Sequence, residues 1–305
     1  MILHHYDFSN FSEKVRLVLA YKNISWKSVI IPSHLPKPDY IPLTAGYRRT
    51  PALQIGADVY CDTRLIVSVL ESIVPSPTLY PMATSGLDFA TCKMIEDWAE
   101  TNFIRPIALY VTGIHARQFP KDFHFDRADL HGKRRPSVEQ VELSAARYRK
   151  QVEIYLDWLD QLLAGAGRYV LGEDISITDI VLYEGPWFLK KISRKEDFLK
   201  CRPALRGWFH KIERIKQSAV EEIDPSSAIR LAFESRPAEV IGSADALEDL
   251  KIGQLVKVSA IGQNVTATGE LVHLDSETIT ISSKTALTGV IHVHFPRLGY
   301  SLRTI

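Results

Sequence analysis

Two helix starts in the first 75 residues carry side chains that could bind or activate a small polar ligand. Ser9 and Ser12 stand at the start of one amphipathic segment, and Asp62 with Thr63 opens another. The first amides of a helix have no partner within it and the helix dipole is positive at that end, so each start attracts an anion. A ligand carboxylate could take these amides while Asp62 holds an ammonium group.

The same side chains have a simpler role as helix caps. Asn10 and Glu13 have the spacing of a capping box, and either Asp62 or Thr63 could cap the second helix. Each helix start, taken alone, favours capping over ligand binding.

A third segment places a proline at the first position of a predicted strand. Pro51 follows Thr50 and precedes the apolar run that starts at Ala52. Proline cannot donate to a sheet ladder and is tolerated there. A cis bond before Pro51 would turn the Thr50 backbone outward to pair with an extended peptide, whereas a trans proline that only begins a strand is the commoner arrangement. The residues alone leave this choice open.

An α/β unit is needed to position these candidates, and we place it at residues 1–80. Short apolar runs alternate there with amphipathic stretches, a pattern typical of a sheet with helices on its faces. The expected strands are 2–6, 26–31, 52–55 and 58–61, and the expected helices are 12–22 and 62–73.

The rest of the chain divides into a helical part and a strand-rich part. At residues 85–222 apolar residues recur every three or four positions, which predicts an all-helical domain with a polar loop at 115–136. We expect a linker at 223–249. Five short apolar runs separated by turn residues predict a small β-barrel or meander at 250–305. The expected helices are 88–111, 137–163, 177–191 and 203–216, and Ser176 with Asp179 marks the start of the third.

Composition narrows the possible function classes. Thirty-seven Lys and Arg residues balance 36 Asp and Glu residues, so no overall field attracts nucleic acid. The first residues lack a basic segment followed by a long apolar run, and no apolar stretch reaches the roughly 20 residues of a membrane span. Three scattered cysteines suit a reducing compartment. We therefore expect a cytoplasmic protein that binds neither nucleic acid nor membrane.

The order and spacing of these segments resemble those of the glutathione transferase superfamily, in which a thioredoxin-like domain precedes a helical domain. The resemblance covers about residues 1–217, and the strand-rich tail is not a standard part of the superfamily. It rests on the motifs Ser9-Asn10-Phe11-Ser12-Glu13-Lys14-Val15-Arg16, Thr50-Pro51, Asp62-Thr63, Ser176-Ile177-Thr178-Asp179 and Pro203-Ala204-Leu205-Arg206-Gly207-Trp208.

The resemblance implies that glutathione is the co-substrate. Ser9 would stand where serine-type members keep the hydroxyl that hydrogen-bonds the glutathione sulfur, and Ser12 at the second cysteine position of a thioredoxin CxxC. With serine at both places the chain lacks the dithiol needed for disulfide exchange. The aromatic residues of the helical part have the spacing of core packing, although Tyr110 could line an apolar pocket.

The same resemblance assigns the remaining contacts with glutathione. Pro51 would follow a cis bond, and Thr50 would pair with the cysteinyl backbone. Asp62 and Thr63, where the family usually has Glu-Ser, would hold the γ-glutamyl end, and Arg49 would lie near the glycyl carboxylate.

These roles make a glutathione transferase the leading hypothesis. A free thiol has a pKa near 8.5, and lowering it by about two units takes about 2.7 kcal/mol. One hydroxyl donor to a charged acceptor contributes about 1.5 to 3 kcal/mol, and the helix dipole adds a fraction. Ser9 would thus stabilise the thiolate, which attacks a small apolar electrophile or displaces an ether or halide.

Two alternatives stay open. The protein could hold glutathione or another ligand without catalysis. Cys61 could instead serve a glutathione-dependent thiol reductase, although the adjacent Asp62 tends to raise the pKa of a thiol. His292 and His294 share a strand face, where an exposed polar surface is commoner than a metal site, so we expect no metal. The resemblance also implies a homodimer.

Overall fold

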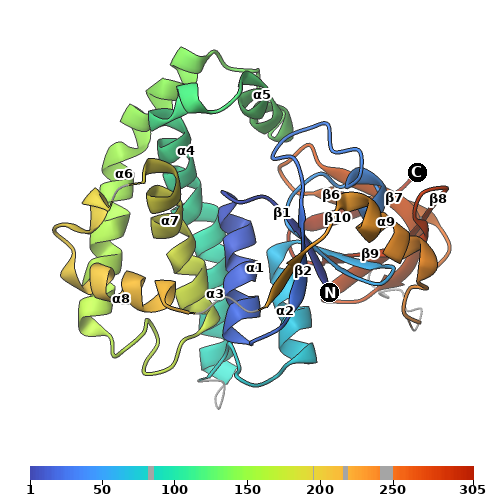
Figure 1. Ribbon diagram of the computed structural model, residues 1–305, viewed down its shortest axis with the longest axis horizontal. Coiled ribbons are helices and arrows are strands. Elements are labelled where there is room, and N and C mark those ends of the chain that lie inside the picture. Colours follow the sequence, from blue (N-terminus) through green and yellow to red (C-terminus); the bar gives the residue numbers. More distant parts are fainter. Residues whose placement is uncertain (82–85, 195, 216–218, 241–249) are drawn as a thin grey trace.

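The structure is a computed structural model that describes residues 1–81, 86–194, 196–215, 219–240 and 250–305. Figure 1 shows a helical layer, an α/β unit at the centre and a strand-rich extension beside it. Within the described ranges no helix is long and apolar enough to cross a membrane.

The α/β unit has a thioredoxin-like arrangement. Its strands are β1 (Ile2–His5), β2 (Trp26–Ile30), β3 (Ala52–Ile55) and β4 (Asp58–Cys61). β1 runs parallel to β2 and antiparallel to β3, which pairs with β4. Helices α1 (Asn10–Tyr21) and α2 (Thr63–Ile73) lie between the sheet and the helical layer, and the short turn η1 (Ile41–Thr44) precedes β3. The strands and helices expected at 1–80 are all present.

The helical layer packs its longest helices around one core. It contains α3 (Gly86–Trp98), α4 (Ile104–Ile114), α6 (Val138–Gly165), α7 (Ile177–Ser193) and α8 (Pro203–Glu213), with the short turns η3 (Ala116–Gln118) and η4 (Asp197–Leu199). A π-helical turn, η2 (Ala99–Phe103), joins α3 to α4 where the sequence predicted one helix.

Two local features fix α7 in this layer. A Cβ on Gly185 would lie 2.6 Å from the Cδ1 atom of Ile107, so glycine lets α7 approach α4. The predicted capping box is also present, because a carboxylate oxygen of Asp179 accepts the backbone N–H of Ser176 at 3.0 Å.

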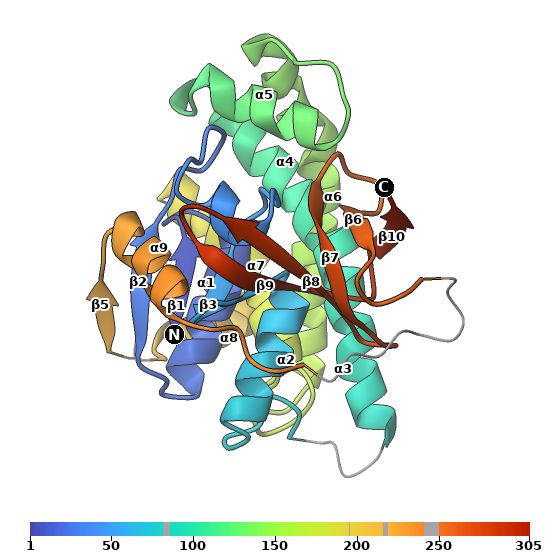
Figure 2. The same cartoon turned by 90° about the vertical axis from the view of Figure 1, so that its right-hand side faces the viewer.

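The segment at 115–136 is not the polar loop that the sequence predicts. It contains α5 (Lys121–Leu130), which extends from the top of the helical layer towards the α/β unit (Figure 1) and lies above the sheet in the view of Figure 2. Periodicity missed this helix because it has no continuous apolar stripe. Tertiary contacts hold it instead: Asp126 accepts the backbone N–H of Leu35 at 3.1 Å and pairs with Arg48 at 2.9 Å.

The C-terminal extension is a meander of β6 (Leu255–Ala260), β7 (Thr266–Leu274), β8 (Thr278–Thr285) and β9 (Gly289–Pro296), with β10 (Tyr300–Thr304) returning beside β6. The strand order is linear, so the ladder does not close into the barrel that was the other expectation.

The extension does not form a sheet of its own. β9 pairs in parallel with β4, and the described strands form one ten-stranded sheet in the order β10-β6-β7-β8-β9-β4-β3-β1-β2-β5. β5 (Val220–Glu222) adds a strand beside β2 at the end of the region expected to be all-helical. α9 (Pro225–Glu234) occupies the first part of the expected linker, and the rest of it at 241–249 lies outside the described residues.

Candidate functional site

Three sequence-predicted segments leave the central sheet at the same edge. His4 in β1 is paired with Ala52 in β3, and Ala52 is paired with Cys61 in β4. The chain therefore reaches Ser9 just beyond the end of β1 and Asp62 just beyond the end of β4. Pro51 lies between them at the start of β3, so the register alone brings the two helix starts and the proline together.

Ser9 is the cap of α1, and its hydroxyl oxygen accepts the backbone N–H of Ser12 at 3.1 Å. Ser9 is only 2% exposed. The predicted capping box of Asn10 and Glu13 is wrong, because Asn10 already lies in the helix and Glu13 pairs with Arg16 at 2.7 Å. A hydroxyl can accept and donate at once, so capping leaves the Ser9 proton available to a ligand.

The Thr50-Pro51 peptide bond is cis. The Thr50 hydroxyl accepts a hydrogen bond from the Lys37 ammonium at 2.9 Å, and the same ammonium donates to the backbone oxygen of Arg48 at 2.9 Å. Burial and the neighbouring Arg127 lower the pKa of Lys37 to about 7. Lys37 was not among the residues predicted from sequence; its only local signal is its place between Pro36 and Pro38.

Asp62 caps α2, with its carboxylate accepting the backbone N–H of Arg64 at 3.1 Å. Its φ of 76° turns the chain sharply from β4 into the helix. The Arg49 guanidinium lies 3.9 Å from the same carboxylate. Arg49 thus stands beside the acid expected to hold the γ-glutamyl end of glutathione, and its expected place near the glycyl carboxylate stays a prediction. A third neighbour is Tyr300 of the extension, which donates to Asp62 at 3.0 Å.

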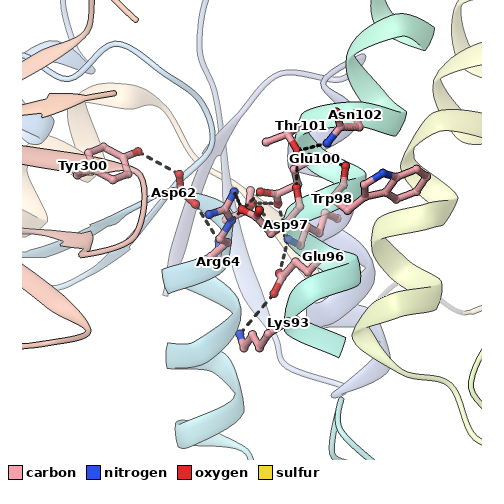
Figure 3. Close-up of polar contacts among 12 residues, drawn as sticks. Asp62, Arg64, Lys93, Glu96, Asp97, Trp98, Glu100, Thr101, Asn102 and Tyr300 are labelled. Atoms are coloured by element: carbon pink, nitrogen blue, oxygen red, sulfur yellow. Dashed lines mark hydrogen bonds and ion pairs between the residues drawn. The ribbon is translucent and has the colours of Figure 1, made fainter. Parts of the chain in front are cut away.

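A buried ionic network lies beneath these residues (Figure 3). The Lys14 ammonium binds Glu96 at 2.6 Å and Glu100 at 2.7 Å, and Arg64 binds Glu100 at 2.9 Å. The Thr63 hydroxyl donates to Glu100 at 3.0 Å, so it points into this network. Burial opposes the charge on Glu100, but Lys14 and Arg64 outweigh it and lower the pKa of this carboxyl to about 2.

The network bridges the two layers and continues beside Ser9. Asn10 donates to the carboxylate of Glu184 on α7 at 3.3 Å. The other oxygen of Glu184 has no hydrogen-bond partner among the described residues, and neither has the buried Ser12 hydroxyl. Burial raises the pKa of Glu184 well above its ordinary value, and the charge of Lys14 opposes this shift.

An aromatic cluster stands next to Ser9. Phe8 packs against Phe119 and Phe123, with ring centroids 5.7 and 6.0 Å away, and Tyr6 lies 4.8 Å from Phe8. Two of these rings come from the segment that was expected to be a loop. The segment at 115–136 therefore brings apolar surface to the candidate site. Tyr110, the other aromatic candidate, is half-buried on α4 and packs against the main core.

Cys61 is not placed for redox chemistry. It is fully buried in β4, and burial together with Asp62 raises the pKa of its thiol well above the ordinary value. Thiolate chemistry needs the opposite shift.

The candidate metal-ligand positions are occupied by other contacts. His294 is buried and binds Asp58 at 2.9 Å, so the expectation of an exposed histidine face is wrong. A group of possible ligands among the described residues, Glu196, His210 and Glu213, surrounds the ammonium of Lys190, which forms ion pairs with both glutamates.

Comparisons with known proteins agree with this architecture. Residues 3–78 match the family model for the glutathione S-transferase N-terminal domain, and residues 121–218 match that for the C-terminal domain. A search of curated proteins found no match.

Among solved structures, a GST-like protein from Pseudomonas syringae is 30% identical to this chain. The match covers 100% of this chain and 98% of that protein, with a TM-score of 0.77. Gtt2 from Saccharomyces cerevisiae is 20% identical over 70% of this chain and 96% of its own, with a TM-score of 0.54. A glutathione S-transferase from Methylobacillus flagellatus, solved with glutathione bound, is 20% identical over 70% of this chain and 94% of its own, with a TM-score of 0.54. The family models and the full-length match show that the chain belongs to the glutathione S-transferase superfamily.

Proposed function

We propose that this protein is a serine-type glutathione transferase in which Ser9 stabilises the glutathione thiolate. The observation that carries the proposal is the meeting of Ser9, the cis Thr50-Pro51 bond and Asp62 at one sheet edge. The site offers a helix start, a strand start and a carboxylate, which suit a thiolate, a peptide backbone and an ammonium group respectively.

Each end of glutathione has a complementary group in this arrangement. Asp62 would bind the γ-glutamyl ammonium, and Arg49, 3.9 Å from Asp62, would bind the carboxylate beside it. The backbone of Thr50 would pair with the cysteinyl unit. Lys37, which contacts Thr50, would meet the glycyl carboxylate, and that negative charge would favour the ammonium form of Lys37 over the neutral amine.

The chemical step follows from the hydroxyl of Ser9. Its proton hydrogen-bonds the thiolate while its oxygen keeps the cap of α1, so the helix start and the hydroxyl stabilise the same charge. The thiol proton leaves to solvent, the sulfur forms a bond with an electrophilic carbon, and a halide or ether oxygen departs with the bonding pair. The aromatic rings of Phe8, Phe119 and Phe123 suit a small apolar electrophile.

We also propose that the active form is a cytoplasmic homodimer. Exposed apolar side chains on α3, those of Met94 and Trp98, offer a surface that a second copy could cover. Equilibrium sedimentation tests this expectation, and a monomer at micromolar concentration would contradict it.

Ser9→Ala tests the mechanism, with Ser137→Ala as its matched control. Both serines cap a helix through one backbone N–H, but Ser137 starts α6 on an exposed surface. Each variant should lose about 1 kcal/mol of stability. Only Ser9→Ala should lower the rate of conjugation to an activated aryl halide, by about 10- to 100-fold at neutral pH.

The loss should shrink at alkaline pH, where glutathione ionises without help. Unchanged turnover in Ser9→Ala with glutathione still bound would indicate a ligand-holding protein, in which Ser9 serves only as the cap.

A further inference from the structure

The C-terminal extension reaches the candidate glutathione site through one side chain, that of Tyr300. Tyr300 is the first residue of β10 and is 4% exposed. Its hydroxyl donates to a carboxylate oxygen of Asp62 at 3.0 Å, across 238 positions of sequence. Figure 3 shows the ring pointing from the extension towards Asp62 at the start of α2.

A second tyrosine extends this hydrogen bond into a chain of three groups. The hydroxyl of Tyr47 lies 2.5 Å from that of Tyr300. A phenol has one proton to donate, and Tyr300 gives its proton to Asp62, so Tyr47 must donate to Tyr300. The chain Tyr47 to Tyr300 to Asp62 is polarised towards the carboxylate, which strengthens its last bond.

The contact leaves Asp62 able to bind a ligand. One carboxylate oxygen accepts from Arg64 N–H and the other from Tyr300, whereas a carboxylate has about four acceptor positions. The Asp62 side chain is 13% exposed, so part of it is accessible to a ligand. Two bonds to opposite oxygens hold the plane of the carboxylate and leave acceptor positions for an ammonium group.

The extension is attached firmly enough for such a role. β9 is paired with β4 from Asp58 to Tyr60, immediately before Asp62. At this junction the His294 ring binds Asp58 at 2.9 Å and stacks on Tyr60 with centroids 4.5 Å apart. Tyr300 therefore lies in the same sheet as β4, the strand that ends at Cys61 directly before Asp62.

We propose that the C-terminal extension is a structural part of the glutathione site and that Tyr300 is a positioning residue for Asp62. The inference rests on the proposed function, and it adds a specificity device to it: Tyr300 holds the short aspartate side chain in the orientation that receives the γ-glutamyl ammonium. The extension then affects how tightly the γ-glutamyl end binds, not the chemistry at the sulfur.

Calorimetric titration of the full-length protein with two thiols tests this role. Glutathione has the γ-glutamyl group, and cysteinylglycine lacks it. Tyr300→Phe should raise the dissociation constant for glutathione about tenfold and leave that for cysteinylglycine within about twofold. The kcat at saturating glutathione should also stay within about twofold, because the sulfur contacts are unchanged.

His294→Asn is the matched control for a merely loosened extension. It removes the imidazole that binds Asp58 and Thr280 and stacks on Tyr60 at the β4–β9 junction. The contacts of Asp62 stay in place, so the glutathione dissociation constant should stay within about twofold. Tyr47→Phe removes the donor to Tyr300. It should weaken the binding of glutathione about threefold and leave the binding of cysteinylglycine unchanged. If Tyr300→Phe does not fold, Tyr47→Phe carries the test, and equal affinity for glutathione in that variant then overturns the inference.

The outcomes separate the inference from the function on which it rests. If the wild-type protein binds no glutathione, the proposed function fails and the inference with it. If the wild-type protein binds glutathione but Tyr300→Phe binds it equally well, or loses both thiols in parallel, only the inference is overturned.

Discussion

Replacing Lys14 by methionine should destabilise the protein more than any surface charge change. The Lys14 side chain is 0% exposed, and its ammonium lies 2.6 Å from Glu96 and 2.7 Å from Glu100. Both carboxylates are themselves at most 8% exposed. Lys14→Met leaves them without this cation, although Arg64 still binds Glu100.

The magnitude follows from the cost of an uncompensated buried charge. Removing one partner of a buried ion pair costs about 3 to 5 kcal/mol, against a total stability of about 5 to 15 kcal/mol. Lys27 provides the control, because it forms an ion pair with Glu221 in which the two side chains are 47% and 64% exposed. Lys27→Met should change the free energy of unfolding by less than about 1 kcal/mol.

The loss of unfolding free energy caused by Lys14→Met should depend on pH. The pKa of Glu100 is lowered to about 2 in the folded protein, so its contribution is present above the ordinary carboxyl pKa of about 4.3 and is lost as the pH falls through about 2. Without Lys14 this pKa rises, which removes part of that contribution. The difference from wild type is therefore full at pH 7 and smaller at pH 4.

Urea unfolding of the three proteins at pH 7 and pH 4, followed by circular dichroism, measures these differences. If Lys14→Met lowers the free energy of unfolding at pH 7 by less than about 1 kcal/mol, or by no more than Lys27→Met does, Lys14 is not the central cation of the network.

Three further results are expected. Asp179→Ala should lower the free energy of unfolding by roughly 3 kcal/mol, because the buried carboxylate accepts both the N–H and the hydroxyl of Ser176. A urea midpoint near that of wild type would contradict this. Gly269→Ala should cost about 1 to 3 kcal/mol, since its Cβ would lie 2.5 Å from the backbone oxygen of Ser282, and a wild-type melting temperature would argue against this packing. A thiol reagent should label Cys201 in the native protein and spare the two buried cysteines; mass spectrometry showing rapid labelling of either buried thiol would overturn their placement.

Local sequence patterns predicted the helices and strands whose own apolar periodicity marks a buried face. The alternating apolar run of β3 and β4 and the helical spacing of α7 gave bounds close to those observed, because one buried face dictates the period of each element. Turn residues between Leu255 and Thr304 likewise placed every strand of the extension.

The features that escaped prediction depend on contacts between distant segments. α5 has no apolar stripe and is held by Asp126 and neighbouring aromatic rings. β5 is a three-residue strand whose partner lies in the α/β unit. The join of β9 to β4 decides that the extension shares the central sheet, and nothing in either strand alone specifies this pairing.

The residues of the candidate site likewise divide into those that local sequence patterns reveal and those that only tertiary contacts reveal. Ser9, Pro51 and Asp62 could be found because each follows or begins a recognisable element. Tyr300 and Lys14 could not, because an isolated tyrosine in a strand and a lysine in an amphipathic helix look like ordinary surface residues until the tertiary structure buries them.

The central claim is that the protein lowers the pKa of bound glutathione. The most direct test is ultraviolet difference absorbance of the thiolate, recorded as wild-type protein is titrated with glutathione across a range of pH. We predict a thiolate signal that titrates about two units below the free thiol's pKa of about 8.5, and a signal shifted back towards that value in Ser9→Ala. Glutathione bound with an unshifted pKa, or an identical titration in both proteins, would contradict the account.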